Sequence, residues 1–478
     1  MKNLSPKLVW EIFDQITKVP RPSKKEEKII AYLLDFAEKH SLECKRDDIG
    51  NVVIKKPATA GYEAMPTVVL QSHMDMVCEK NSNVEHNFET DPIVTKIVDG
   101  WVKAEGTTLG ADCGIGMAAA LAVLVDDTIE HGAIEALFTV DEETGLTGAF
   151  NLGEGMISGK YLINLDSEDE GELFIGCAGG VDTIGRIKYS VETLPADYEY
   201  YRIAVSDLKG GHSGDDIDKG LGNSNKILAY FLYDVQRYGI RLGMFDGGNL
   251  RNAIPREAYA VVAVPKQNAL LFETALATYI SAVKSLYAIT EPNLKISVSE
   301  ATLQPVIDSV TQKKLLAALV GLPNGVLAMS QAMKGLVETS TNLASVKFVG
   351  NEIVITTSQR SSVERAKKDA KHAVEAVLEL AGATVEHSDG YPGWNPNPDS
   401  QLLQWSVDSY KELFGVEPKV RAIHAGLECG LFLEKYPHLE MVSFGPTLRG
   451  VHSPDERLEI ATVDKFWRLL LDVLKRVK

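Results

Sequence analysis

The chain has 478 residues, of which 45% are hydrophobic and 24% charged, and its formal net charge is −17. This length exceeds the size at which a single hydrophobic core stops growing, so we expect two or three domains. The negative charge repels polyanions, which argues against nucleic acid as a partner.

Cysteine use and the apolar segments indicate the compartment. The chain has five cysteines, an odd number, and no two of them form a C-x-x-C pair. This favours a reducing environment over a disulfide framework. The first residues lack the apolar core of a signal peptide. The longest strongly apolar stretch, 117–125, is too short to span a bilayer. We therefore expect a cytoplasmic, soluble protein with no membrane partner.

The first 180 residues alternate between strand and helix patterns. Ser23 to Glu26 has the form of a capping box ahead of a helical stripe of apolar residues. Strands are then predicted at 51–54, 67–71, 133–140 and 161–165, with an Ala-rich helix at 114–126. This order predicts an α/β fold with a mostly parallel sheet and helices on both faces.

The pattern changes after Gly179-Gly180 and returns near residue 388. We expect a catalytic domain formed by 1–181 and 387–478, interrupted by an α+β lid domain at 182–386. Within the lid, a strand at 258–264 with a following helix resembles a strand at 353–357 with its helix. A duplicated βα unit and chance similarity both explain this resemblance.

Two short motifs place metal-binding residue types directly after apolar strands. His73 and Asp75 follow the run 67–70. Glu142 and Glu143 follow a second such run. Because open α/β sheets build their sites at the carboxyl ends of strands, this pattern indicates metal-assisted hydrolysis.

His73 and Asp75 share a face while the chain stays extended. His73 can then bind a metal while Asp75 orients its imidazole from behind. Glu142 and Glu143 can divide their roles, one binding the metal and the other acting as general base toward a metal-bound water. Surface residues on loops are the alternative for both pairs.

Asp112 lies among glycines just before the Ala-rich helix. Simple N-capping would explain an acid there, but the glycines let the backbone approach a bound group closely. One carboxylate can bridge two metals about 3.5–4 Å apart. Asp166 and His452 also follow predicted strands or their loops, and five ligands of His and carboxylate type suit zinc or a similar ion.

Four further residues are candidates outside these motifs. His212 lies in a Gly-rich turn, and Arg360 could pair with a substrate carboxylate. His424 and Glu428 are surrounded by small residues that could line a pocket. An incidental turn, an exposed loop and an ordinary helix N-terminus are the respective alternatives.

At these residues the chain resembles the di-zinc metallopeptidase family that includes carnosinases, tripeptidase T, carboxypeptidase G2 and aminoacylases. The resemblance extends over the whole chain. Its motifs, at 71–77, 107–112, 424–430 and 445–456, are typical of the aminoacyl-histidine dipeptidases within that family.

The resemblance implies two zinc ions per chain, which cobalt or manganese could replace. One would be held by His73 and Asp166 and the other by Glu143 and His452, with Asp112 as the bridge and a cis peptide after it.

The resemblance also implies the catalytic roles. Asp75 would orient His73, and Glu142 would act as general base and later as general acid. His212 would polarise the scissile carbonyl, while Asn252 and Arg360 would anchor the substrate.

The implied activity is hydrolysis of Xaa-His dipeptides such as carnosine, and of other dipeptides. Deacylation of N-acyl amino acids or cleavage of tripeptides would use the same site residues. A non-catalytic zinc-binding scaffold would have lost Glu142, Asp75 or a ligand, and none is lost. A homodimer is compatible with this activity, and in many relatives the lid histidine acts on the other subunit. A duplicated lid would instead supply both halves within one chain.

Overall fold

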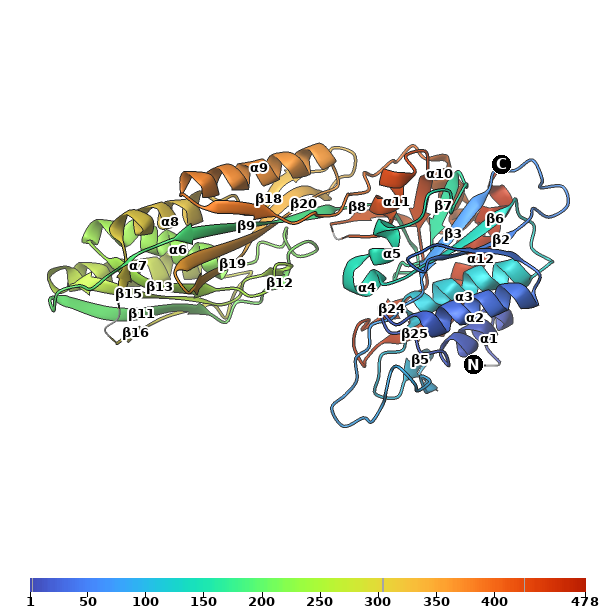
Figure 1. The fold of residues 1–478 in the computed structure, drawn as a ribbon, viewed down its shortest axis with the longest axis horizontal. Coiled ribbons are helices and arrows are strands. Elements are labelled where there is room, and N and C mark those ends of the chain that lie inside the picture. Colours follow the sequence, from blue (N-terminus) through green and yellow to red (C-terminus); the bar gives the residue numbers. More distant parts are fainter. Residues whose placement is uncertain (2, 303–304, 425) are drawn as a thin grey trace. The chain divides into compact units, whose positions relative to one another are not determined.

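The computed structural model describes residues 1, 3–302, 305–424 and 426–478 (Figure 1). The chain forms two compact units. The first unit comprises 1–176, 396–422 and 428–478, and the second unit comprises 177–395 and 423–427. The sequence had suggested boundaries at 181/182 and 386/387. It gave no sign that 423–427 groups with the second unit.

The first unit is built on an eight-stranded sheet. In spatial order its strands are β1 (Glu43–Arg46), β2 (Val52–Lys56), β6 (Ile134–Thr139), β3 (Val68–His73), β7 (Tyr161–Asn164), β23 (Glu440–Ser443), β8 (Glu172–Cys177) and β22 (Lys419–Ile423). The central strands β6, β3, β7 and β23 pair in parallel, while β1, β2 and β8 pair antiparallel with their neighbours. The sheet is therefore mixed, with a parallel centre.

Helices of the first unit cover this sheet. They are α1 (Lys7–Ile16), α2 (Glu27–Lys39), α3 (Ala111–Val125), α4 (Glu142–Gly145), α5 (Thr147–Phe150), α10 (Gln401–Phe414), α11 (Cys429–Lys435) and α12 (Ile460–Arg476). The Ala-rich helix α3 is buried along nearly its whole length and packs on β3, β6 and α1. Its small side chains let it lie close to the strands that precede the site. A small sheet joins β24 (Leu448–Arg449), β25 (Arg457–Glu459), β5 (Trp101–Ala104) and β4 (Thr95–Val98).

The predicted capping box is wrong. Helix α2 begins at Glu27, and its N-cap residue Glu26 makes no side-chain bond to the helix. The Ser23 hydroxyl donates to Asp75 instead, and the Glu26 carboxylate accepts from the N–H groups of Lys24 and Asp141. The polar residues that matched the local motif are used by distant parts of the chain.

The second unit is built on a nine-stranded antiparallel sheet. Its main path runs β16 (Lys295–Glu300), β11 (Tyr198–Ser206), β15 (Ala258–Pro265), β13 (Arg241–Gly247), β19 (Val337–Val349), β20 (Glu352–Ser361), β9 (Gly179–Lys188) and β21 (Thr384–His387), and β18 (Gly325–Met329) pairs with β19. Two short ribbons join β10 (Val191–Glu192) to β17 (Val306–Ile307) and β12 (Gly211–His212) to β14 (Ala253–Ile254).

The helices of the second unit pack into one core with this sheet. They are α6 (Ser224–Val235), α7 (Ala269–Leu286), α8 (Ser309–Gly321) and α9 (Glu364–Leu380), with short 3-10 turns at η1 (Gln236–Tyr238) and η2 (Lys266–Asn268). Figure 1 shows the four long helices along the same side of the sheet. By length and composition alone, 266–286 could cross a bilayer, but α7 contributes Phe272, Leu276 and Val283 to the core.

The two halves of this sheet follow the same order of elements. One half runs β11, α6, β13, β15, α7, β16, and the other runs β9, α8, β19, β20, α9, β21. From the outer edge inward, the strands of one half lie in the order β16, β11, β15, β13, and those of the other half in the equivalent order β21, β9, β20, β19. The two halves meet where β13 pairs with β19. The similar strand–helix stretches noted in the sequence fall at equivalent places, β15–α7 and β20–α9.

A buried lysine caps the C-terminus of helix α8. Lys226 is 7% exposed, and its ammonium donates to the carbonyls of Leu319, Val320 and Leu322 at 2.8, 2.9 and 2.6 Å. These are carbonyls that a helix C-terminus cannot pair internally.

We expect Lys226→Met to lower the free energy of unfolding by about 2–3 kcal/mol, because the carbonyls lose a charged donor. Urea unfolding followed by far-UV circular dichroism measures this change. Lys313→Met, at an exposed position on the same helix, is the control and should change stability little. Equal effects of the two substitutions would show that the capping contacts contribute nothing specific.

Candidate active site

The predicted ligands of the first unit converge at the carboxyl ends of the parallel strands. His73 is the last residue of β3, and Asp166 follows β7 by two residues. Glu143 lies in α4, directly after β6, and Asp112 lies at the start of α3. His452 follows β24 with φ of 59°, a conformation that non-glycine residues adopt mainly at turns and functional sites.

Asp112 lies between two His–carboxylate pairs. Its Oδ1 is 2.9 Å from His73 Nε2, which is also 3.4 Å from Asp166 Oδ1. Its Oδ2 is 3.3 Å from His452 Nε2, which is 2.9 Å from Glu143 Oε2. The two oxygens of one carboxylate thus face two separate ligand pairs, and the peptide bond after Asp112 is cis.

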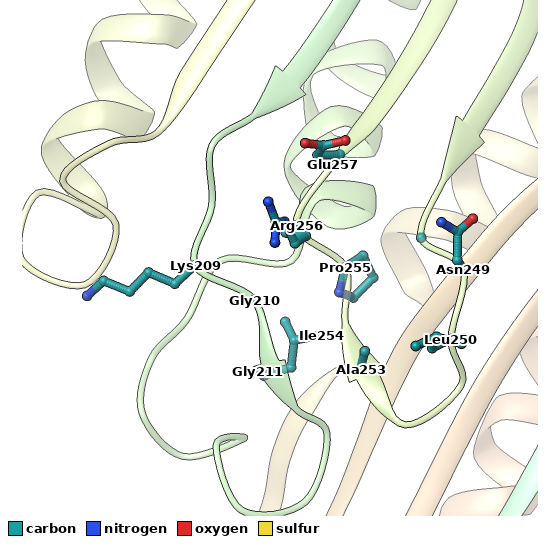
Figure 2. Close-up of a pocket in the computed structure, with 11 residues that line it drawn as sticks. Lys209, Gly210, Gly211, Asn249, Leu250, Ala253, Ile254, Pro255, Arg256 and Glu257 are labelled. Carbon is teal, nitrogen blue, oxygen red and sulfur yellow. The ribbon is translucent and has the colours of Figure 1, made fainter. Parts of the chain in front are cut away.

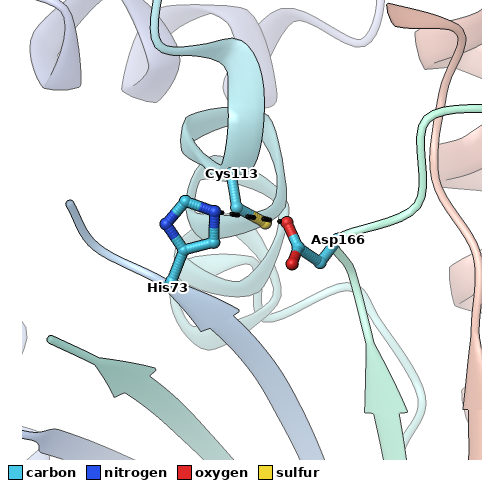
Figure 3. A group of neighbouring side chains, drawn as sticks. All are labelled: His73, Cys113 and Asp166. Carbon is cyan, nitrogen blue, oxygen red and sulfur yellow. Dashed lines mark ion pairs between the residues drawn. The ribbon is translucent and has the colours of Figure 1, made fainter. Parts of the chain in front are cut away.

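A third side chain lies beside the first pair. Figure 3 shows His73, Cys113 and Asp166 converging from β3, α3 and the segment after β7. The Cys113 thiol donates to the carbonyl of Leu165 at 3.3 Å, and burial raises its pKa well above the usual value. Cys113 is therefore a neutral neighbour of the predicted ligands.

The electrostatics of this group favour bound cations. Burial raises the pKa of Asp166 to about 6, and hydrogen bonds to Asp112 and Glu143 raise the pKa of His452 to about 11. Within the described part of the chain, Glu143 Oε1 and Asp166 Oδ1 are buried without a hydrogen-bond partner. Carboxylate oxygens that lack a hydrogen bond and lie beside two imidazoles form a donor set that fits zinc or a similar dication.

Asp75 is fully buried behind His73 and receives four hydrogen bonds. Its Oδ1 lies 3.2 Å from His73 Nδ1 and accepts from the Glu142 N–H at 3.1 Å. Its Oδ2 accepts from the Ser23 hydroxyl at 2.7 Å and the Glu143 N–H at 3.3 Å. One carboxylate therefore fixes both the imidazole and the backbone of the acidic pair.

Glu142 lies beside the predicted ligands, close enough for the charges of His73 and Asp166 to influence its pKa. Burial raises its pKa well above that of an ordinary glutamate, while His73 opposes the shift. A carboxyl group with a raised pKa can take and return a proton near neutral pH.

Glu456 organises the Asp112 loop, a role that the sequence analysis missed. Its Oε2 accepts from the N–H groups of Leu109 and Gly110 at 2.7 and 3.0 Å. Its Oε1 accepts from those of Ala111 and Asp112 at 2.8 and 3.3 Å. Because Glu456 satisfies these donors, Asp112 does not cap the helix and its carboxylate stays available as a ligand. The position of Glu456 four residues after His452 was the only signal in the sequence.

Arg21 was also missed. It is 1% exposed, and its guanidinium donates to the carbonyls of Met74, Asp75 and Gly110. A side chain at Gly110, which has φ of 67°, would collide with Arg21 Nη2 at 2.6 Å. Arg21 thus joins the loops that carry His73 and Asp112 through their backbone.

The second unit gathers another set of predicted residues. His212 Nδ1 accepts from the N–H groups of Gly214 and Asp215 at 3.3 and 3.2 Å, which in a neutral imidazole leaves Nε2–H free to donate. Arg360 is 7% exposed, and its Nη1 donates to the Tyr391 hydroxyl at 3.0 Å. Among the described residues, Arg360 Nε is buried without a partner.

His424 belongs to the same set. Its Nε2 lies 2.7 Å from the Ser340 hydroxyl, while its buried Nδ1 has no partner among the described residues. Burial, aided by Arg360, lowers the pKa of His424 to about 4. His424 is therefore a neutral imidazole beside a cationic Arg360.

Asn252 lies next to His212, because β12 and β14 pair His212 with Ala253. The Asn252 carbonyl accepts from the Ser213 N–H at 2.8 Å. A cavity of about 440 Å³ opens on this ribbon and is lined by residues 209–211, 248–250 and 253–257 (Figure 2).

Glu428 differs from the other predicted substrate contacts. It belongs to the first unit, and the residue is 1% exposed. Its Oε2 accepts from Gln71 Nε2 at 2.6 Å and from the Thr139 hydroxyl at 2.8 Å.

A mixed sheet flanked by helices, with histidines and carboxylates gathered at the carboxyl ends of its parallel strands, is the arrangement of a metal-dependent hydrolase with an α/β fold. The model of peptidase family M20/M25/M40 matches residues 69–476, and the chain belongs to this family. It is a hydrolase that acts on peptide bonds, and the resemblance noted in the sequence is confirmed.

Two relatives match along nearly their whole length. The chain is 42% identical to the cytosol non-specific dipeptidase of Escherichia coli, with 100% of this chain and 99% of that protein covered. It is 43% identical to the crystal structure of aminoacylhistidine dipeptidase from Vibrio alginolyticus, with a TM-score of 0.95 over 100% of this chain and 98% of that chain. A Staphylococcus aureus tripeptidase shares the fold at 16% identity, with a TM-score of 0.57 over 99% of each chain.

We expect Glu456→Ala to release the N–H groups of 109–112 and to weaken metal binding about 10–100-fold, as loss of a group that supports a ligand does. Amide hydrogen exchange of 109–112 and calorimetric titration with zinc measure the two effects. Asp455→Asn, at the exposed neighbouring position, should change neither. Unchanged exchange in Glu456→Ala would contradict the role of this carboxylate.

Proposed function

We propose that this chain is a two-zinc dipeptidase that hydrolyses Xaa-His dipeptides such as β-alanyl-histidine, together with other dipeptides, in the cytosol. The observation that carries the proposal is the Asp112 carboxylate, whose two oxygens face the His73–Asp166 and the Glu143–His452 pairs. The names of the Escherichia coli and Vibrio alginolyticus relatives support the substrate class and the compartment. A homodimer stays a prediction.

His73 and Asp166 would hold one zinc, Glu143 and His452 the other, and Asp112 would bridge them. Cobalt or manganese could occupy the same ligands. Bound there, the metals would supply Lewis acidity and a water of lowered pKa. Asp75 keeps the imidazole of His73 oriented, with Nε2 toward the ligand group.

Glu142 is proposed as the general base that takes a proton from the attacking water. It would then return that proton to the amine that leaves as the C–N bond breaks. A raised pKa suits both steps, because the carboxylate must accept the proton and the carboxylic acid must release it at the same pH.

Residues of the second unit are proposed to bind the substrate. His212 would donate from Nε2 to the oxygen of the scissile carbonyl as negative charge develops there. Arg360, with an unpaired buried Nε, suits the C-terminal carboxylate, which a guanidinium can bind through two parallel hydrogen bonds. Asn252 and His424 are proposed as further polar contacts to the dipeptide.

The first test compares wild type with Glu142→Ala, each loaded with zinc, on β-alanyl-histidine. We expect kcat to fall about 10²–10⁴-fold, because the proton acceptor is lost, while the bound zinc measured by mass spectrometry is unchanged. If the wild type does not hydrolyse the dipeptide but does hydrolyse N-acetyl amino acids, the substrate assignment is wrong. If wild type cleaves neither, a non-catalytic scaffold becomes the better reading.

The second test concerns the substrate carboxylate. We expect Arg360→Met to raise KM for β-alanyl-histidine about 30-fold, corresponding to about 2 kcal/mol for a lost charge-assisted contact. For β-alanyl-histidinamide, which lacks the carboxylate, KM should be the same in variant and wild type. Arg365→Met, at an exposed position, is the control. An equal loss on both substrates would disprove the pairing of Arg360 with the carboxylate.

A further inference from the structure

A row of buried polar side chains crosses the parallel strands directly below the ligands. Gln71 on β3 is in register with Asn164 on β7, and Asn164 is in register with Ser443 on β23. Gln71 precedes His73 by two residues, and Asn164 precedes Asp166 by two. Because side chains two apart along a strand share a face, Gln71 lies one step below His73.

The hydrogen bonds of this row run in one direction. The Ser443 hydroxyl donates to Asn164 Oδ1, and Asn164 Nδ2 donates to Gln71 Oε1, both at 2.5 Å. Gln71 Nε2 then donates to Glu428 Oε2, as does the hydroxyl of Thr139 at the end of β6. Glu428 is thus the final acceptor of a chain that links four strands.

The carboxyl group of Glu428 is well suited to this place when it is protonated. Burial raises its pKa to about 8, with Asp166 adding to the shift and His73 opposing it. Oε2 already accepts two hydrogen bonds, which leaves Oε1 for the proton, and Oε1 is buried without a partner among the described residues. A neutral acid adds no further negative charge to a site that is rich in carboxylates.

We propose that Glu428 is a positioning residue, which terminates this hydrogen-bonded row and so holds the strand ends that carry His73 and Asp166 at the spacing of metal ligands. The inference rests on the proposed two-metal function. It replaces the direct substrate contact expected from the sequence with a role through Gln71 and Thr139. Without Glu428, Gln71 Nε2 keeps only the longer bond to the Thr139 hydroxyl, at 3.2 Å, so the Gln71 amide is held less firmly against Asn164.

The test measures zinc binding to wild type, Glu428→Ala and Glu428→Gln by calorimetric titration of the metal-free protein. We expect Glu428→Ala to bind zinc about 10–100-fold more weakly. Glu428→Gln should bind zinc nearly as wild type does, because an amide oxygen accepts the same two hydrogen bonds and its NH₂ replaces the protonated Oε1. At saturating zinc, KM for β-alanyl-histidine should be unchanged in both variants.

Glu135→Ala is the matched control. Glu135 is a buried glutamate at the opposite end of β6, where it accepts from Lys55, Ser158 and Gly159. We expect its loss to lower the melting temperature without changing the zinc affinity. If Glu428→Ala does not fold, Thr139→Val tests the inference in its place. This substitution removes one donor to Glu428 and should weaken zinc binding, whereas Glu428→Gln should not.

Each other outcome overturns the inference. Unchanged zinc affinity in Glu428→Ala, or the same loss in Glu135→Ala, would leave Glu428 with a purely structural role. A raised KM with unchanged zinc affinity would return Glu428 to the substrate contacts. If wild type itself binds no zinc, the proposed function fails as well, so the two failures are distinguishable.

Discussion

Mutual repulsion among buried carboxylates is the constraint on which the first unit depends. Asp112, Glu143 and Asp166 lie within reach of two imidazoles, and Asp75 and Glu142 lie directly beside them. Such a group persists only if each carboxylate is hydrogen-bonded, paired or neutralised. Asp75 meets this condition with four donors. On the proposed ligands Glu143 and Asp166, one oxygen each is buried without a hydrogen-bond partner among the described residues.

The same constraint explains why supporting contacts come from far along the chain. The loops that carry the ligands are short and follow different strands, so none can supply its own donors and acceptors. Arg21 donates to the carbonyls of two of these loops, and Glu456 accepts from the N–H groups of one of them, the Asp112 loop. Arg21 and Glu456 bind no metal in the proposal, yet they fix the backbone conformation of the loops that carry the proposed ligands.

Local sequence patterns predicted the parallel centre of the sheet and the residues that converge at its edge. An apolar run followed at once by His73 or by Glu142 indicates, within a few residues, both a buried strand and the candidate residue at its end. The failures concern contacts between segments. Ser23 and Glu26 match a capping box, but their partners, Asp75 and the Asp141 N–H, lie 52 and 115 residues away. The one local signal at Glu456, its position four residues after His452, did not indicate that it would hold the backbone at 109–112. The antiparallel strands β1 and β8 of the first sheet were likewise absent from the prediction, and β2 was predicted as a strand at 51–54 without its antiparallel pairing, because that pairing depends on strands far along the chain.

The division of the chain has a consequence for protein engineering and for recombination between relatives. The second unit is not one continuous insertion, because the five residues 423–427 group with 177–395. His424 therefore reaches Ser340 and Arg360 from a separate stretch of sequence. A chimera that exchanges only 177–395 would combine Arg360 from one parent with His424 from the other. In the proposed function, an exchange of substrate preference therefore has to carry both segments. Four crossovers exchange these two segments alone, whereas two crossovers that flank 177–427 also exchange 396–422 of the first unit.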